Sequence, residues 1–251
     1  MKKSASGKIV IATTTFYNFN NKSDRIRAKI AERTFRKAQK EGYLVICVDG
    51  GSPLKFIEKI RKLGVKVYPQ KIKGMGNSRR QVFSEAYKSG KEIIIWTEPE
   101  KESFIKEIKK AVGPIIKEKA DMVIPKRKSL KSYPVSQMHI ERFGNAFWKQ
   151  LTGKDLDIWA GMRIFKRDIV KYFLDYVGEY GDTWEILVIP IMDIIKDKNR
   201  IVSLEINYQH PKEQTHIEEK DIEFYKKRLD QLNNLIPAVI DHWNKLKNRH
   251  I

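Results

Sequence analysis

Residues Glu92–Ser103 read EIIIWTEPEKES, and the organisation of the chain can be inferred outward from this segment. The four apolar residues Ile93–Trp96 form the short continuous run that is typical of a strand buried on both faces of a sheet. Glu98 and Glu100 follow directly, on either side of a proline that cannot donate a hydrogen bond to a sheet. Ligands of open parallel sheets bind beyond the carboxyl ends of the strands, where two acids can hold a divalent cation. The simpler alternative is an acid-rich turn after a strand.

Strand-like and helix-like segments alternate along the first hundred residues. Apolar runs typical of strands occur at residues 8–15, 43–48, 65–68 and 93–96. Helical spacing occurs between them, at residues 23–40, 53–63 and 78–89, with Ser23 or Asp24 as the expected cap of the first helix. The short connections predict βαβ units and a parallel sheet. Since the carboxyl ends of parallel strands share one edge, Thr13–Thr15, Asp49 and the two glutamates are expected to line one cleft.

The second half of the chain predicts further helices and strands. Helices are expected at residues 103–118, 135–151, 167–174, 184–195 and 220–248, and strands at residues 121–125, 158–165 and 200–208. The first residues are interpreted as a tail that enters the first strand rather than as a signal peptide. The pattern favours one α/β domain over residues 1–211, with residues 212–251 as a basic helical extension packed on it.

Composition narrows the class of protein. Hydrophobic residues make up 41% of the 251 residues and charged residues 32%, which is typical of a soluble globular chain. No apolar run approaches the roughly 20 residues that span a bilayer. The single Cys47 lies in an apolar strand and excludes an internal disulfide and a cysteine-based zinc cage. These features predict a cytoplasmic protein.

The net charge is +19, which predicts attraction to nucleic acid, anionic lipid headgroups or phosphorylated substrates. The lysines are spread along the whole chain, as on an ordinary solvated surface. The charge therefore supports an anionic partner without pointing to nucleic-acid binding.

Two loops carry residues that suit a phosphorylated nucleotide. Asp49 is followed by Gly-Gly-Ser, so its carboxylate could accept from a ribose hydroxyl or a base N–H; the alternative is a simple Asp-Gly turn. The segment Gly74–Arg80, GMGNSRR, lacks the G-K-[ST] of a P-loop, but its glycines free backbone N–H groups and its arginines could meet phosphate.

Later side chains have both a functional and an ordinary interpretation. His210 follows a predicted strand and could be a third metal ligand, or simply a hydrogen-bonded residue. Trp159 could stack on a sugar or base, or pack in the core. Asp182 and Glu185 begin a helix, where a carboxylate is either a cap or a catalytic base. No Ser/His/Asp or Cys/His arrangement supports nucleophilic hydrolysis.

The order of these motifs resembles a nucleotide-sugar glycosyltransferase of the GT-A fold, similar to glycosyltransferase family 2, over about residues 8–211. The segments that carry the resemblance are KIVIATTTFYN, VICVDGGS, GMGNSRRQVFSEAYKSG, DMVIPKRK, YGDTWEILVIP and RIVSLEINYQHP. Glu98-Pro99-Glu100 stands where the family has its Asp-x-Asp metal motif. The most specific match is N-x-x-x-x-x-L-T-G at Asn145–Gly153 followed by D-x-x-x-G-M-R-x-F at Asp157–Phe165.

The resemblance implies an α/β GT-A fold, a mostly parallel twisted sheet with flanking helices, and transfer of a sugar from a nucleotide-diphosphate sugar. The nucleotide-sugar would contact Thr13, Thr14, Asp49, Arg79, Trp159 and Gly161. Mg²⁺ or Mn²⁺ on the diphosphate would be held by Glu98, Glu100 and His210. Asp157 would position sugar or acceptor, and Asp182 or Glu185 would be the base of an inverting attack.

The sequence is also compatible with two other functions. A sugar-phosphate nucleotidyltransferase has a related sheet but carries a G-x-G-T-R-like loop after its first strand, and ATTTFYNFNN has no glycine. A non-enzymatic binder of nucleic acid or anionic surfaces would use the net charge, but no RNA- or DNA-binding motif occurs. The acceptor would be a small molecule, a glycan or a lipid-linked sugar, the last reached by peripheral contact with an anionic membrane at its inner face.

Overall fold

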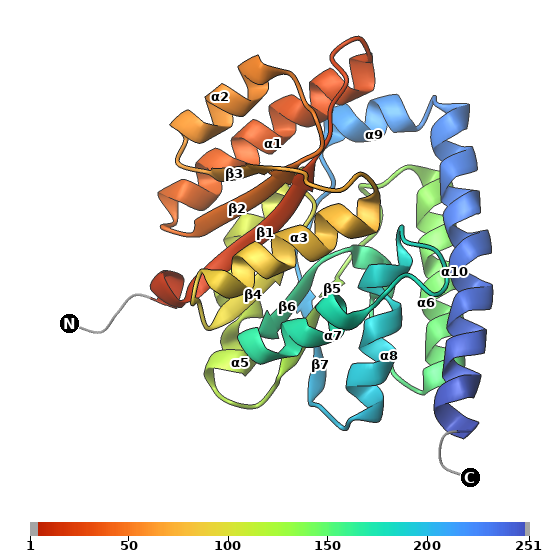
Figure 1. Ribbon diagram of the computed structural model, residues 1–251. Helices are drawn as coiled ribbons and strands as arrows, with labels where there is room; N and C mark the ends of the chain where they lie inside the picture. The colour runs from red at the N-terminus through yellow and green to blue at the C-terminus, as the bar shows by residue number, and fades with distance from the viewer. Residues whose placement is uncertain (1–4, 249–251) are drawn as a thin grey trace.

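The buried strand predicted from the central segment forms the middle of a seven-stranded sheet in the computed structural model, which describes residues 5–248 (Figure 1). The strands are β1 (Ile9–Thr15), β2 (Leu44–Asp49), β3 (Lys66–Pro69), β4 (Ile93–Trp96), β5 (Met122–Arg127), β6 (Arg163–Lys166) and β7 (Ile201–Ile206). Their order in the sheet is β3-β2-β1-β4-β6-β5-β7. Only β6 is antiparallel to its neighbours among the described strands, so the predicted mostly parallel sheet is confirmed.

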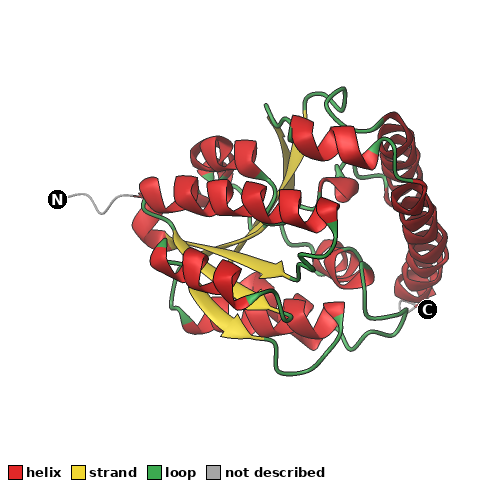
Figure 2. Ribbon diagram, turned by 90° about the horizontal axis from the view of Figure 1, so that it is seen from above, coloured by secondary structure: helices red, strands yellow, loops and turns green. Residues whose placement is uncertain are grey.

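Helices cover both faces of this sheet (Figure 2). The longer ones are α1 (Lys22–Lys40), α2 (Leu54–Lys62), α3 (Met75–Lys88), α6 (Val135–Thr152), α7 (Val170–Asp175), α8 (Ile189–Lys196), α9 (Lys212–Glu218) and α10 (Ile222–Asn248). Short helical segments are η1 (Ala5–Lys8), η2 (Glu102–Glu107), α4 (Ile108–Ala111), α5 (Gly113–Ile116), η3 (Ile158–Ala160), η4 (Arg167–Ile169) and η5 (Glu185–Leu187). None of the helices in residues 5–248 is both long and apolar enough to cross a membrane.

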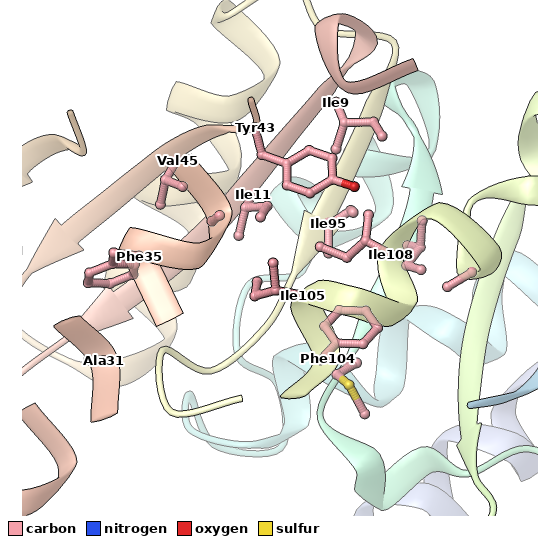
Figure 3. Close-up of a cluster of buried hydrophobic side chains, with 14 of the residues drawn as sticks. Ile9, Ile11, Ala31, Phe35, Tyr43, Val45, Ile95, Phe104, Ile105 and Ile108 are labelled. Carbon is pink, nitrogen blue, oxygen red and sulfur yellow. The ribbon is translucent and has the colours of Figure 1, made fainter. Parts of the chain in front are cut away.

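The two faces of the sheet bury alternate residues of the same strands, as the two-residue period of a strand requires. Ile9, Ile11 and Ile95 point to one face, where they pack with α1, α2 and the segment from η2 to α5 (Figure 3). Val10 and Ile94 point to the other face, which α3, α6, α7, α8 and α10 cover. Both faces are apolar, so the strands read as continuous hydrophobic runs rather than as alternating ones.

Several local predictions differ from the structure. Helix α1 is capped by Asn21, whose side chain accepts from the backbone N–H groups of Ser23 and Asp24; neither of those residues is the cap. The expected helix over residues 103–118 is broken into η2, α4 and α5, since a new helical segment begins at Gly113-Pro114. Residues 158–160 are helical rather than part of a strand, and α9 was not predicted.

The C-terminal helix α10 packs against α6 and α8 and runs along one side of the molecule (Figure 1). Leu235, Val239 and Leu246 of this helix are buried in the same hydrophobic cluster as the sheet. The division into residues 1–211 and 212–251 stays a prediction. The first residues of the predicted N-terminal tail and the last residues of the predicted extension lie outside the described residues.

Candidate functional site

A cavity of about 890 Å³ opens at the carboxyl ends of β1 and β4. One side of it, the basic wall, comprises Thr14, Thr15, Phe16, Gly50, Gln70, Lys73, Gly74, Met75, Ser78 and Arg79. A second wall comprises Gln137, Glu141, Ile158, Trp159, Gly161, Trp184 and Leu187. Glu98 to Lys101 lie between the two walls, and Tyr208, His210 and residues of α9 and α10 close a third side. The cavity thus has the position expected of a ligand site in an open α/β sheet.

The end of β1 reaches the cavity through Thr14 and Thr15, whereas Thr13 is buried and its hydroxyl has no hydrogen-bond partner. Asp49 lies behind the basic wall. Its carboxylate accepts from the Thr15 hydroxyl at 2.7 Å and from the backbone N–H groups of Gly51 and Ser52 at 2.8 Å each. Asp49 therefore holds the turn that places Gly50 in the basic wall. It also holds the side chain of Thr15 in that wall.

Arg79 of α3 is a buried cation on the basic wall. Its guanidinium donates to the carbonyl of Thr183 and lies 5.4 Å from the centre of the Trp96 ring. Burial lowers the pKa of Arg79 to about 10, and the carboxylates of Glu98 and Glu185 counteract that shift. The Nε atom has no partner, so the side chain retains an unused donor.

The Glu98 carboxylate lies beside Gly161 of the second wall, which also carries the indole of Trp159. Glu98 Oε2 is buried without a hydrogen-bond partner. A Cβ atom at Gly161 would lie 2.2 Å from Glu98 Oε1, and the φ angle of Gly161 is +77°, so only glycine fits there. Trp159 packs equally closely on α6, because a Cβ atom at Gly144 would lie 2.0 Å from its Nε1. The two glycines set the positions of Glu98 and Trp159.

Glu100 already has two partners within the protein, a hydroxyl and a guanidinium. Its Oε1 accepts from the Tyr17 hydroxyl at 2.8 Å and pairs with the Arg27 guanidinium at 2.9 Å. The carboxylate raises the pKa of Arg27 more than any other group does. Burial, and then Glu100, raise the pKa of Tyr17.

His210 lies on the third side of the cavity, stacked on Tyr133 with ring centres 4.4 Å apart. Its Nε2 is 3.2 Å from Glu218 Oε2, and Gln214 donates to the other oxygen of Glu218 at 2.7 Å. Burial lowers the pKa of His210, which favours the neutral imidazole. Its Nδ1 is buried and has no partner.

The three predicted metal ligands all line the cavity but do not converge. Glu98 contacts Gly161, Glu100 contacts Tyr17 and Arg27, and His210 contacts Glu218. Within residues 5–248, no three His, Cys, Asp or Glu residues are arranged to hold a metal ion. Magnesium is usually held by one or two carboxylates plus substrate phosphates, rather than by a cage of protein ligands alone. The unpartnered Nδ1 of His210 and the carboxylate of Glu100 are donor atoms of the kind that such a partial site uses.

Asp157 belongs to a buried ion cluster rather than to the cavity wall. Its two oxygens accept from Arg127 Nε at 2.8 Å, from Arg127 Nη2 at 2.7 Å and from Asn145 at 2.8 Å. Arg127 also pairs with Glu141, whose other oxygen accepts from Gln137 at 2.6 Å. Burial would raise the pKa of Asp157, but Arg127 outweighs it and lowers that pKa. Asp157 positions Glu141 and Gln137, which do line the cavity.

The two predicted bases also have other partners. Asp182 forms a two-point ion pair with Arg80, with one contact at 2.7 Å, and its backbone carbonyl accepts from Gly76 N at 2.8 Å. Glu185 accepts from the backbone and hydroxyl of Thr183 at 2.9 and 2.8 Å. Neither residue is among the described residues that line the cavity, whereas Trp184 between them is.

Sequence reasoning missed several residues of the cavity. Arg27, Lys101, Trp184, Lys227 and Arg228 all line it. Lys101 follows Glu100 directly; its Nζ donates to the Tyr133 hydroxyl at 3.0 Å and lies 4.9 Å from the centre of the Tyr208 ring. The basic stretch of α10 was the available signal, but a lysine-rich helix is indistinguishable from a solvated surface in the sequence alone.

Comparison with known protein families matches residues 19–174 to the family described as glycosyl transferase family 2. A comparison with curated proteins finds no match.

Similar solved structures include three of glucosyl-3-phosphoglycerate synthase from Mycobacterium tuberculosis. The complex with Mn²⁺, uridine diphosphate and glucosyl-3-phosphoglycerate is 11% identical, covers 94% of this chain and 80% of that chain, and has a TM-score of 0.67. The complex with Mn²⁺, UDP-glucose and phosphoglyceric acid is 10% identical, with the same coverage and TM-score. The complex with Mg²⁺ and UDP is 12% identical, covers 81% and 71%, and has a TM-score of 0.59. These matches confirm the fold predicted from the order of the motifs.

Proposed function

This chain belongs to glycosyl transferase family 2, and from that premise we propose that it transfers a hexosyl group from a nucleotide-diphosphate sugar to an acceptor hydroxyl. The observation that carries the proposal is the cavity of about 890 Å³ at the strand ends, whose lining combines the basic wall with the Glu98 carboxylate and the indoles of Trp159 and Trp184. A cation-lined wall suits a diphosphate, and indole faces suit a sugar ring.

The nucleotide would bind against Thr14, Thr15 and Gly50, with the diphosphate near Arg79 and the N-terminus of α3. A helix N-terminus favours anions because its first N–H groups and its dipole point at the ligand. In this proposal Thr13 and Asp49 act indirectly, since Asp49 holds Thr15 and the turn at Gly50 in place.

The transferred sugar would lie between Glu98, Gly161 and Trp159. The absence of a side chain at Gly161 leaves room for the Glu98 carboxylate, which lies 2.2 Å from where a Cβ atom would be. Asp157 contributes through Arg127, which orders Glu141 at the same wall.

We assign the proton acceptor to Glu98 in preference to the predicted Asp182 and Glu185. All three are carboxylates, but only Glu98 lines the cavity and keeps a buried oxygen without a partner. A base must reach the acceptor hydroxyl, and geometry precedes pKa in choosing it.

A divalent cation, Mg²⁺ or Mn²⁺, would be held by Glu100 and His210 together with diphosphate oxygens. When bound, it would stabilise the negative charge that develops on the departing nucleoside diphosphate. Arg27 already compensates Glu100, so a metal at this position has to share the carboxylate with the guanidinium.

Isothermal titration of the full chain with UDP- and GDP-sugars, with and without Mn²⁺, tests the proposal. UDP-glucose with phosphoglyceric acid is the first donor and acceptor pair to assay, because a protein of similar fold binds both. We expect one nucleotide-sugar to bind and to be consumed when an acceptor is present. If folded protein binds none of the panel, the proposal is wrong.

A further inference from the structure

Helix α10 forms one side of the cavity, although it lies outside the residues matched to the family. Its first turns contribute Asp221, Glu223, Phe224, Lys227, Arg228 and Gln231 to the lining. Asp221 accepts from the backbone N–H groups of Glu223 and Phe224 at 3.0 and 3.3 Å, so it caps the helix. Lys227 and Arg228 follow within the next turn and take no part in this cap. Capping therefore does not account for their presence beside the cavity.

Arg228 is held in one orientation without a carboxylate. One terminal nitrogen donates to Gln231 Oε1 at 3.0 Å, and the guanidinium lies 4.8 Å from the centre of the Phe224 ring. Its Nε is buried without a partner. A guanidinium that is oriented by a ring and an amide, and keeps an unused donor, is suited to bind an anion.

Lys227 is the other cation on this side of the cavity. No ion pair to a carboxylate is formed by Lys227 or Arg228 within residues 5–248. Desolvation, followed by Arg27 and Arg228, lowers the pKa of Lys227 to about 8, although part of the side chain is exposed to solvent. Glu218 and Glu100 oppose that shift but do not overcome it.

Arg27 brings the same kind of charge from α1. Its terminal nitrogen pairs with Glu100 at 2.9 Å, while its Nε is buried without a partner. Arg27, Lys227 and Arg228 all line the same cavity. Arg27 is offset by Glu100, whereas Lys227 and Arg228 form no carboxylate ion pair among residues 5–248, and unpaired cations in a concave site attract anions.

We propose that Lys227 and Arg228, together with Arg27, bind a phosphate group of the ligand in this cavity. The phosphate would belong either to the diphosphate of the sugar donor or to a phosphorylated acceptor. The inference rests on the proposed function only for these two sources of phosphate. The phosphate site itself follows from the three cations. Helix α10 thereby completes a site whose other walls come from the family-matched part of the chain.

Isothermal titration of the full chain in EDTA tests the site without metal. The variants are Lys227→Met and Arg228→Met, and the matched control is Lys226→Met, an exposed neighbour on the same helix that does not line the cavity. The titrants are inorganic pyrophosphate, UDP, 3-phosphoglycerate and uridine. Each cavity variant is expected to weaken binding of a phosphorylated titrant by about tenfold or more, as for other hydrogen bonds to charged groups. Uridine binding and the thermal midpoint should be unchanged.

The titrants separate the two sources of phosphate. Weaker binding of pyrophosphate and UDP assigns the site to the donor, and weaker binding of 3-phosphoglycerate alone assigns it to the acceptor. The inference is overturned if all phosphorylated titrants bind the variants as they bind the wild type, if the Lys226 control loses as much affinity, or if the wild type binds no phosphorylated titrant. If pyrophosphate shows the loss but no nucleotide-sugar binds the wild type, the proposed function fails while the phosphate site stands.

Discussion

Gly144 lies inside helix α6, where alanine is normally the more stable residue by about 1 kcal/mol. Here a Cβ atom would lie 2.0 Å from Trp159 Nε1. We therefore expect Gly144→Ala to lower the free energy of unfolding by about 1–3 kcal/mol through overpacking. Displacement of Trp159 should also weaken sugar binding. Urea denaturation measures the first effect and titration the second.

Gly113→Ala is the control, because Gly113 has a negative φ and a Cβ atom added there would have no other atom within 4 Å. That variant should leave stability and binding nearly unchanged. A stabilised Gly144→Ala variant would mean that Trp159 does not pack on the helix as described.

The proton acceptor can be identified by comparing Glu98→Gln with Asp182→Asn. Because a general base contributes roughly 10²–10⁴-fold, Glu98→Gln should lower kcat by at least about 100-fold while donor affinity is retained. Asp182→Asn loses its pairing with Arg80 and should reduce thermal stability while keeping most of the rate. Steady-state kinetics with thermal denaturation distinguishes the two; the opposite pattern would return the role to Asp182.

Residue types at the site could be predicted, but their partners could not. The sequence placed Glu98 at a strand end, and the resemblance to the family added Arg79 and Trp159; all three line one cavity in the structure. It could not show that Asp182 faces Arg80, because that contact joins residues about a hundred positions apart. The spacing of residues along a chain carries no information about which carboxylate meets which cation.

At the scale of elements, Asp121 joins the beginnings of β5 and β7 to the end of β6. It lies just before β5, and its carboxylate accepts from Lys166 of β6 at 2.8 Å and from the backbone of Arg200, before β7, at 2.9 Å. The Arg200 side chain and then Lys166 outweigh partial burial and hold the pKa of Asp121 well below its usual range. This carboxylate therefore links the edge of the sheet electrostatically.

Asp121→Asn is expected to lower the free energy of unfolding at pH 7 by about 1–3 kcal/mol, because hydrogen bonds to a charged group are lost. The pKa is lower in the folded state, so the carboxylate stabilises the fold above the unfolded pKa of about 4. That contribution declines as the pH falls below about 4, and the difference between variant and wild type should narrow. Urea denaturation at pH 7 and pH 3 measures both effects.

Asp155→Asn serves as a control for this prediction, since Asp155 pairs with exposed lysines and its side chain is 56% exposed. Exposed pairs contribute about 0–1 kcal/mol, so this variant should differ little from the wild type. Equal unfolding midpoints for Asp121→Asn and wild type at pH 7 would show that the link is not stabilising.

The main strands and helices were predictable because each has a clear pattern of hydrophobic residues that ends at or near a glycine or proline. Residues 93–96 are a strand in both the prediction and the structure. The antiparallel β6 was not predictable, because Ile158–Phe165 reads as one apolar run while only Arg163–Lys166 pairs with neighbours. Strand direction depends on where the preceding helix returns the chain, and no local pattern records that path.

At the scale of the whole molecule, the net charge of +19 should destabilise the compact state by self-repulsion. Added salt shortens the screening distance to about 8 Å at 0.15 M, so the thermal midpoint should rise from low salt to that concentration. Differential scanning calorimetry in NaCl at constant pH measures the rise. A Lys55→Glu and Lys110→Glu double variant, at two exposed positions, should show a shallower dependence. A midpoint independent of salt would show that the surface charges are already balanced locally.

The placement of α10 has a consequence for how specificity can change. The basic wall comes from residues before 80, whereas α10 contributes its side of the cavity from residues after 220. It is anchored by Val239 and Leu246, which lie beyond the turns that face the ligand, and by Leu235, which is buried and also lines the cavity. The first three turns of α10 can therefore be exchanged or randomised as a cassette while the anchor and the sheet stay intact. Selection for new ligands would then act on a short, contiguous stretch of the gene.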